Sequence, residues 1–184
     1  MVNVAKILIV VDYQRDFVCG SLGFAGAEKL DKLIADRVRD YGRNNVFYTL
    51  DTHFDDYLST REGAALPVAH CIKGTPGHSL YGETAAALDE VGAVGFEKST
   101  FGLKLGDDIL AHLPDNIEEI ELCGLVSNIC VLSNAVIFST AYENARITVD
   151  ARLTACSDSE LNEKALDIMQ GLQINVINRG KNNA

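Results

Sequence analysis

Three side chains capable of chemistry follow, within a few residues, stretches of sequence that resemble buried strands. They are Asp12, Lys98 and Cys130. A carboxylate, an ammonium group and a thiol together form a nucleophilic site, because the carboxylate can take the thiol proton and the ammonium group can stabilise the resulting anions. This set of residues predicts thiol chemistry on a small substrate.

Cys130 lies in a stretch that must turn sharply from a strand into a helix after Gly124, with Ser127 or Asn128 able to cap that helix. We expect the cysteine in the first helical turn, where unpaired N–H groups and the helix dipole stabilise a thiolate and can hold an oxyanion. A free cysteine taken alone is more often a small buried hydrophobe. The acid and the amine named above favour the reactive interpretation.

A second group of polar side chains begins at another predicted strand end. Asp51 and His53 lie on the same side of an extended segment, and Glu62 and His70 follow in the long polar stretch 51–79. Imidazole and carboxylate donors suit zinc, and also iron or manganese. The four residues are therefore predicted ligands of one divalent transition metal, with zinc favoured. The alternative is that they are ordinary polar loop residues.

The elements that would position these residues alternate along the chain. Six apolar runs indicate strands, at 6–11, 46–50, 91–96, 118–123, 146–149 and 174–177. Most are continuously apolar, which is typical of strands covered on both faces. Helices are indicated at 30–41, 103–113 and 161–172, and the stretch 129–141 is apolar nearly all round, which predicts a buried helix. This alternation predicts an α/β fold, a doubly wound six-stranded parallel sheet with helices on both faces, as a single domain over residues 1–184. Ligands of such sheets bind beyond the carboxyl ends of the strands, so the reactive side chains should converge there.

Composition limits the partners and the compartment. The formal net charge is −10 at pH 7, which disfavours nucleic acid and anionic membrane surfaces and leaves a small molecule as the expected partner. We expect no signal peptide and no membrane-spanning segment. The five cysteines form no CxxC pair, so a reducing cytoplasm is the expected location.

Five ordered motifs resemble those of the isochorismatase-like cysteine hydrolases, in particular their nicotinamidase branch, over residues 6–177. The motifs are Asp12-Tyr-Gln14-Arg-Asp16-Phe17, Asp51-Thr-His53, Leu66-Pro-Val-Ala-His70-Cys-Ile-Lys-Gly-Thr-Pro-Gly77, Phe96-Glu-Lys98-Ser-Thr-Phe101 and Gly124-Leu-Val-Ser-Asn-Ile-Cys130-Val. The chain departs from the branch in having no tryptophan, and Glu62 replaces a further histidine of the metal loop.

The resemblance implies roles for these residues. It implies a catalytic triad of Asp12, Lys98 and Cys130, and a cis peptide between Leu125 and Val126 that turns the Val126 N–H toward the oxyanion. It implies that Phe17 stacks on the substrate ring, and that the metal binds the pyridine nitrogen of nicotinamide. Family members often form dimers or tetramers, so a homodimer or homotetramer is expected.

The resulting hypothesis is a metal-dependent nicotinamidase that acts through a Cys130 thioester and serves NAD salvage. A first alternative is another hydrolase of the family, acting on isochorismate or a carbamoyl-type amide. A second is a non-catalytic metal-binding protein, because a fold does not guarantee chemistry. A third is a thiol redox sensor in which Cys71 is the partner of Cys130.

Overall fold

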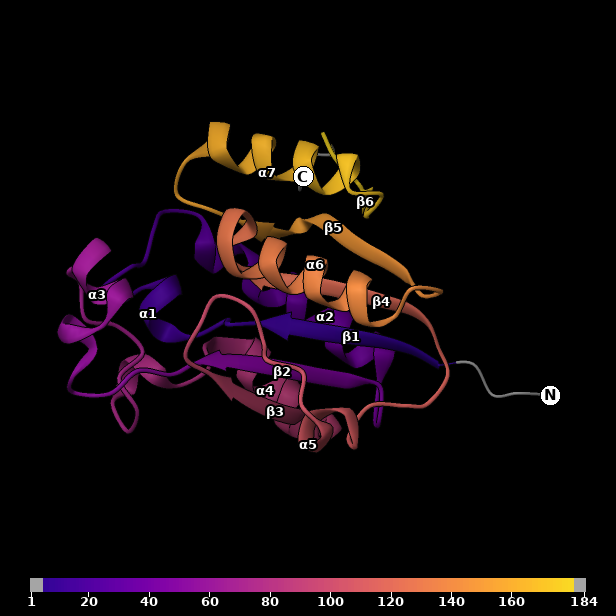
Figure 1. The fold of residues 1–184 in the computed structure, drawn as a ribbon, viewed down its shortest axis with the longest axis horizontal. Coiled ribbons are helices and arrows are strands. Elements are labelled where there is room, and N and C mark those ends of the chain that lie inside the picture. Colours follow the sequence, from indigo (N-terminus) through magenta and orange to yellow (C-terminus); the bar gives the residue numbers. More distant parts are fainter. Residues whose placement is uncertain (1–4, 181–184) are drawn as a thin grey trace.

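A six-stranded parallel sheet forms the centre of the protein (Figure 1). The structure, a computed structural model, describes residues 5–180 without the side chains of residues 107 and 108, so both ends of the predicted domain lie outside it. The strands are β1 (Ala5–Val11), β2 (Val46–Asp51), β3 (Val94–Lys98), β4 (Ile117–Leu125), β5 (Arg146–Ala155) and β6 (Asn175–Ile177). Their order in the sheet is β3-β2-β1-β4-β5-β6, and every pairing is parallel. The predicted α/β fold with six parallel strands is confirmed.

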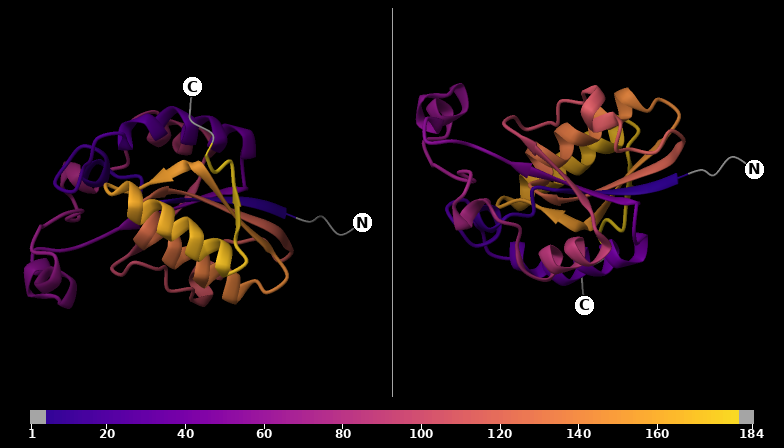
Figure 2. Two further views of the ribbon diagram at one scale, coloured as in Figure 1. Left: turned by 90° about the horizontal axis from the view of Figure 1, so that it is seen from above. Right: turned by 90° about the horizontal axis from the view of Figure 1, so that it is seen from below.

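Helices cover both faces of this sheet. The four longer ones are α2 (Asp31–Tyr41), α4 (Gly82–Val91), α6 (Leu132–Ala141) and α7 (Ser159–Gly171). In both views of Figure 2, α2 and α4 lie on one face and α6 and α7 on the other. On β1, Ile7 and Ile9 belong to the core shared with α6 and α7, whereas Leu8 and Val10 belong to the core shared with α2 and α4. Burial on both faces explains why the strand sequences are continuously apolar.

Short helical segments make up much of the remaining chain. They are α1 (Arg15–Val18), η1 (Ala27–Leu30), η2 (Tyr57–Ser59), α3 (Arg61–Ala65), η3 (Pro76–His78), α5 (Asp107–Leu110) and η4 (Ser127–Val131). The polar stretch 51–79 contains η2, α3 and η3, and α3 lies beyond the carboxyl ends of β1 and β2 (Figure 1). No helix in the described part of the chain is both long and apolar enough to cross a membrane.

The sequence pattern does not predict α4, because the side chain that caps this helix comes from a distant part of the chain. The Asp31 carboxylate of α2 accepts hydrogen bonds from the backbone N–H groups of Glu83 and Thr84, at 2.8 Å each. Because this cap comes from a distant part of the chain, no local capping signal precedes the helix. The strand predicted from residue 91 begins at Val94, because Gly92 adopts a left-handed conformation (φ 66°) and ends α4.

Two predicted helices differ from the observed ones. The apolar stretch after β4 forms two pieces, a π-helical turn (η4) and α6, and it is not buried all round, since Ile129 and Val136 are 36% and 38% exposed. The helix predicted at 103–113 contains only α5, so that prediction was wrong for residues 103–106 and 111–113. Leu103 is held outside the helix because its N–H donates a hydrogen bond to Asn134 of α6 at 2.9 Å.

Candidate active site and metal centre

Strand order determines which reactive side chains meet. β1 lies between β2 and β4, so the sheet order reverses beside it, and clefts at such reversals are the usual ligand sites of these sheets. In register, Val11 of β1 is level with Thr49 on one side and Gly124 on the other, and Asp51 is level with Lys98. The carboxyl ends of β1, β2, β3 and β4 therefore meet at the same edge of the sheet.

The structure brings the three residues of the predicted triad together. The Lys98 Nζ lies 2.6 Å from Asp12 Oδ2, 3.8 Å from the Cys130 sulfur and 3.4 Å from Asp51 Oδ1. The side chains of Lys98 and Asp12 are 1% and 0% exposed, and Cys130 is buried. A buried ammonium group thus lies between two carboxylates and a thiol.

Burial controls the protonation of this cluster. Burial raises the pKa of Asp12, and the positive charge of Lys98 offsets this increase only in part. Burial also raises the pKa of the Cys130 thiol well above its usual value, and the negative charge of Asp12 adds to this effect against the opposing influence of Lys98. For Lys98, burial alone would lower the pKa, but the charges of Asp12, Cys130 and Asp51 outweigh it and raise the pKa.

Burial therefore opposes the thiolate that a helix N-terminus favours. The effect of burial on the pKa of Cys130 exceeds the opposing influence of Lys98, so the protonated thiol is favoured in the resting site. An anion forms there only when a neighbouring base accepts the proton. Asp12, whose raised pKa makes it a stronger base, is the neighbouring carboxylate.

Asp12 reaches this position through unusual backbone. Its φ is 45°, in the left-handed region that Asp tolerates better than most residues. The Thr49 hydroxyl donates to Asp12 Oδ1 at 2.7 Å, and the Asp12 N–H donates to the Thr49 carbonyl at 3.2 Å. On the other side, a Cβ at Gly124 would lie 2.1 Å from the Val11 carbonyl oxygen, so only glycine allows β4 to approach the turn this closely.

Two motif residues without a predicted role, Gln14 and Asp16, hold the surrounding loops. The side-chain amide of Gln14 accepts from the Asp51 N–H at 2.8 Å and donates to the Asp51 carbonyl at 2.9 Å, which fixes the end of β2. The Asp16 carboxylate accepts from the N–H of Cys71 at 2.7 Å, beside His70. Both act at a distance in the sequence, so spacing alone does not reveal them.

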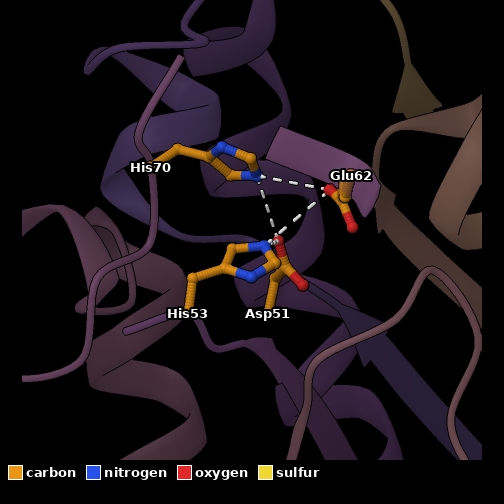
Figure 3. Close-up of side chains that lie close together, drawn as sticks. All are labelled: Asp51, His53, Glu62 and His70. Carbon is orange, nitrogen blue, oxygen red and sulfur yellow. Dashed lines mark hydrogen bonds and ion pairs between the residues drawn. The ribbon is translucent and has the colours of Figure 1, made fainter. Parts of the chain in front are cut away.

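The four predicted metal ligands also converge (Figure 3). The His53 and His70 Nε2 atoms lie 3.0 and 3.3 Å from Asp51 Oδ2, and each lies 3.8 Å from Glu62 Oε1. One donor atom from each residue falls within a group no wider than 4.8 Å. Ligand atoms of a tetrahedral zinc ion are about 3.4 Å apart, given Zn–N and Zn–O bonds of about 2.0–2.2 Å. The observed separations fit a single small cation.

The orientation of the His70 ring also supports a metal site. His70 Nδ1 lies 2.8 Å from the Val68 carbonyl, so Nδ1 carries the proton and Nε2 presents a lone pair to the other donors. For Asp51, burial alone would raise the pKa, but the neighbouring imidazoles of His53 and His70 and the charge of Lys98 hold the pKa below its usual value. A carboxylate oxygen and two imidazole nitrogens are donors that a divalent transition metal prefers.

Both groups of residues open into one cavity of about 260 Å³. Six lining residues were predicted from the sequence: Phe17, Asp51, Glu62, His70, Val126 and Cys130. The other lining residues carry no chemical signal in the sequence: Leu22, Phe24, Leu66, Phe101, Asn128, Ile129, Cys156 and Ser157. The volume is below the roughly 300 Å³ at which drug-sized sites begin, so the cavity suits a small molecule. The Phe17 ring meets the His70 ring edge-on, with 5.5 Å between centroids. The peptide between Leu125 and Val126 is cis, as the family resemblance implies.

Comparisons with known proteins agree with the sequence motifs. Residues 6–179 match the family described as the Isochorismatase domain. A Bacillus subtilis (strain 168) protein described as an uncharacterized isochorismatase family protein, PncA, is 29% identical over 170 residues, which cover 84% of this chain and 88% of that protein.

Two solved structures share the fold. The pyrazinamidase/nicotinamidase from Streptococcus mutans UA159 has a TM-score of 0.82 at 26% identity, covering 94% of this chain and all of that one. A pyrazinamidase of Pyrococcus horikoshii, solved in complex with zinc, has a TM-score of 0.78 at 23% identity, covering 94% and 98% of the two chains. The second likeness is one of fold alone.

Proposed function

The chain belongs to the isochorismatase domain family, and on that premise it is an amidohydrolase for which we propose nicotinamide as the substrate. The products would be nicotinic acid and ammonia. The proposal rests above all on one observation: the Lys98 ammonium contacts both a buried carboxylate and a buried thiol, at 2.6 and 3.8 Å, beneath a small cavity.

Acylation follows from this arrangement. Asp12 takes the proton of the Cys130 thiol, and the sulfur attacks the carboxamide carbon while the C=O electron pair moves onto oxygen. The N–H groups of Val126 and Cys130 would stabilise that oxyanion, and Lys98 balances the charge that remains on the buried acid and thiol. When the C–O double bond reforms, the C–N bond breaks and the nitrogen takes the proton from Asp12. Ammonia leaves, and a thioester remains.

Deacylation uses the same groups in reverse. Asp12 takes a proton from water, the hydroxide oxygen attacks the thioester carbon, and the C–S bond breaks. The proton on Asp12 then returns to the sulfur, which restores the resting thiol and releases the acid. The raised pKa of Asp12 suits this exchange, because it makes the carboxylate a stronger base toward the protons of the thiol and of water.

The ring would be held at the other end of the cavity. Asp51, His53, Glu62 and His70 would hold a divalent metal, for which we propose zinc, and the bound metal would supply a Lewis-acid contact for the pyridine nitrogen. Phe17, which is buried against His70, would provide an apolar surface for the ring.

The cellular setting is part of the proposal. All five cysteines lie in the described part of the chain and all are free thiols, which suits a reducing cytoplasm. A nicotinamidase there would serve NAD salvage. The homodimer or homotetramer implied by the family resemblance stays a prediction.

The test is ammonia release from nicotinamide by the purified, zinc-loaded protein. Wild type and Cys19→Ala, which replaces an exposed cysteine, should release ammonia, and Cys130→Ala should not. No release by wild type, or release by Cys130→Ala, would reject the proposal. Parallel assays with isochorismate and a carbamoyl-type amide distinguish the alternatives within the family, and zinc binding without any turnover would favour the non-catalytic one.

A further inference from the structure

A buried asparagine joins two walls of the cavity. Asn134 is fully buried within the otherwise mainly apolar α6. Its Oδ1 accepts from the Leu103 N–H at 2.9 Å, and its Nδ2 donates to the carbonyls of Phe101 and Cys130 at 3.2 and 2.8 Å. Only this orientation of the Asn134 amide gives the Leu103 N–H an acceptor and gives the carbonyls of Phe101 and Cys130 a donor.

The segment around Phe101 depends on this anchor. Gly102 passes so close to α6 that an added Cβ would lie 2.2 Å from Ile137 Cδ1, and the Thr100 hydroxyl donates to the Gly102 carbonyl at 2.9 Å. The Phe101 side chain is 43% exposed, so packing restrains it little. The backbone that carries the ring is held by the hydrogen bonds of Phe101, Gly102 and Leu103.

Phe101 separates two cavities. One is the 260 Å³ cavity that contains Cys130, and the other, of about 230 Å³, is lined by His53 among others. The residues that line both are Phe101 and Glu62. A shift of the Phe101 segment would widen the cavity above the thiol and weaken the wall that a substrate ring contacts.

We propose that Asn134 is a positioning residue that sets the Phe101 wall and the nucleophile turn relative to each other. One amide holds the backbone of both, so the width of the substrate cavity is fixed by a side chain that does not line it. The inference rests on the proposed function only where nicotinamide is used as the substrate.

The first experiment is a double-mutant cycle on KM. Asn134→Ser and Phe101→Ala should each raise KM for nicotinamide by roughly tenfold, a factor that corresponds to about one net hydrogen bond or apolar contact. In the Phe101→Ala background, Asn134→Ser should raise KM less than about twofold, because the wall that it holds is gone. Multiplicative effects of the two substitutions would overturn the inference.

The second experiment needs no substrate. Iodoacetamide alkylation of Cys130 is followed peptide by peptide by mass spectrometry, with exposed Cys19 as the internal reference. Asn134→Ser and Phe101→Ala should each speed alkylation of Cys130 several-fold, and the double variant should be no faster than Phe101→Ala. An unchanged rate in Asn134→Ser would overturn the inference even if wild type does not hydrolyse nicotinamide.

Two further variants separate positioning from stability. Phe138→Leu truncates a buried residue on the next turn of α6, so it should lower Tm without changing KM or the alkylation of Cys130. Asn134→Asp keeps the acceptor for Leu103 but loses both donors, so it should reproduce the effect of Asn134→Ser on both measurements. If Phe138→Leu changed KM and alkylation as Asn134→Ser does, the role of Asn134 would be structural and the inference would fail.

Discussion

Gly124 marks the tightest approach between β4 and the turn that carries Asp12. Its φ is 106°, which costs an L residue about 1–3 kcal/mol in the folded state. An alanine Cβ there would lie 2.1 Å from the Val11 carbonyl oxygen, where ordinary contacts begin at 3.4 Å, and overpacking of this kind costs about 1–3 kcal/mol. We therefore expect Gly124→Ala to lower the free energy of unfolding by about 2–6 kcal/mol.

The same substitution should also reduce catalysis. Separating β4 from Val11 by roughly 1 Å displaces Asp12 relative to Cys130, and a misplacement of that size can cost about 10²-fold in rate. Gly92→Ala is the matched control, because Gly92 also has a positive φ (66°) but an added Cβ meets nothing within 4 Å. It should cost only about 1–2 kcal/mol and leave activity intact.

Urea unfolding and ammonia release measure the two effects on the same preparations. The reasoning predicts that Gly124→Ala is less stable than Gly92→Ala and that its kcat falls by about two orders of magnitude. Gly124→Ala with the stability of Gly92→Ala and near wild-type turnover would refute it, since the strands would then have room for a methyl group.

Three further predictions concern the charged groups. Lys98→Met should lower the free energy of unfolding by about 3–5 kcal/mol, because it leaves buried carboxylates without their cation. Adding Asp12→Asn should recover part of that loss in urea titrations, and purely additive losses would contradict this prediction. Zinc at a concentration of a hundred times its Kd should raise the free energy of unfolding of wild type by about 2.7 kcal/mol, as measured in thermal scans. Glu62→Gln should reduce this zinc-dependent stabilisation, and an unchanged stabilisation would exclude Glu62 as a ligand. Burial alone would raise the pKa of Asp150, but hydrogen bonds from Arg152 outweigh this effect and lower the pKa below its usual value of 3.8. The ionised carboxylate therefore stabilises the fold above pH 3.8, and this contribution is lost as the pH falls through the lower pKa of the folded state. Unfolding measured from pH 5 to pH 2 should show a weaker pH dependence for Asp150→Asn than for wild type, and identical curves would contradict this.

The sequence by itself determines which residues stand at the strand ends. Asp12 and Lys98 close apolar runs, and Cys130 follows another through a glycine turn, because a buried parallel strand requires a continuous apolar sequence and polar residues are placed where it emerges. The spacing of Asp51 and His53 likewise follows from the two-residue period of extended chain. These signals are local, so one sequence is enough to find them.

Only the tertiary structure decides which strand ends meet and how far they are buried. Strand order placed Lys98 between Asp12 and Asp51, and no local pattern encodes that order. The hydrogen bonds of Asn134 with Phe101 and Leu103, and the Asp31 cap of α4, span long stretches of chain, so they cannot be inferred from spacing. The thiol shows the difference most clearly. Its helix end is visible in the sequence and favours an anion, whereas burial, which depends on the whole fold, raises the pKa of Cys130 and favours the protonated thiol.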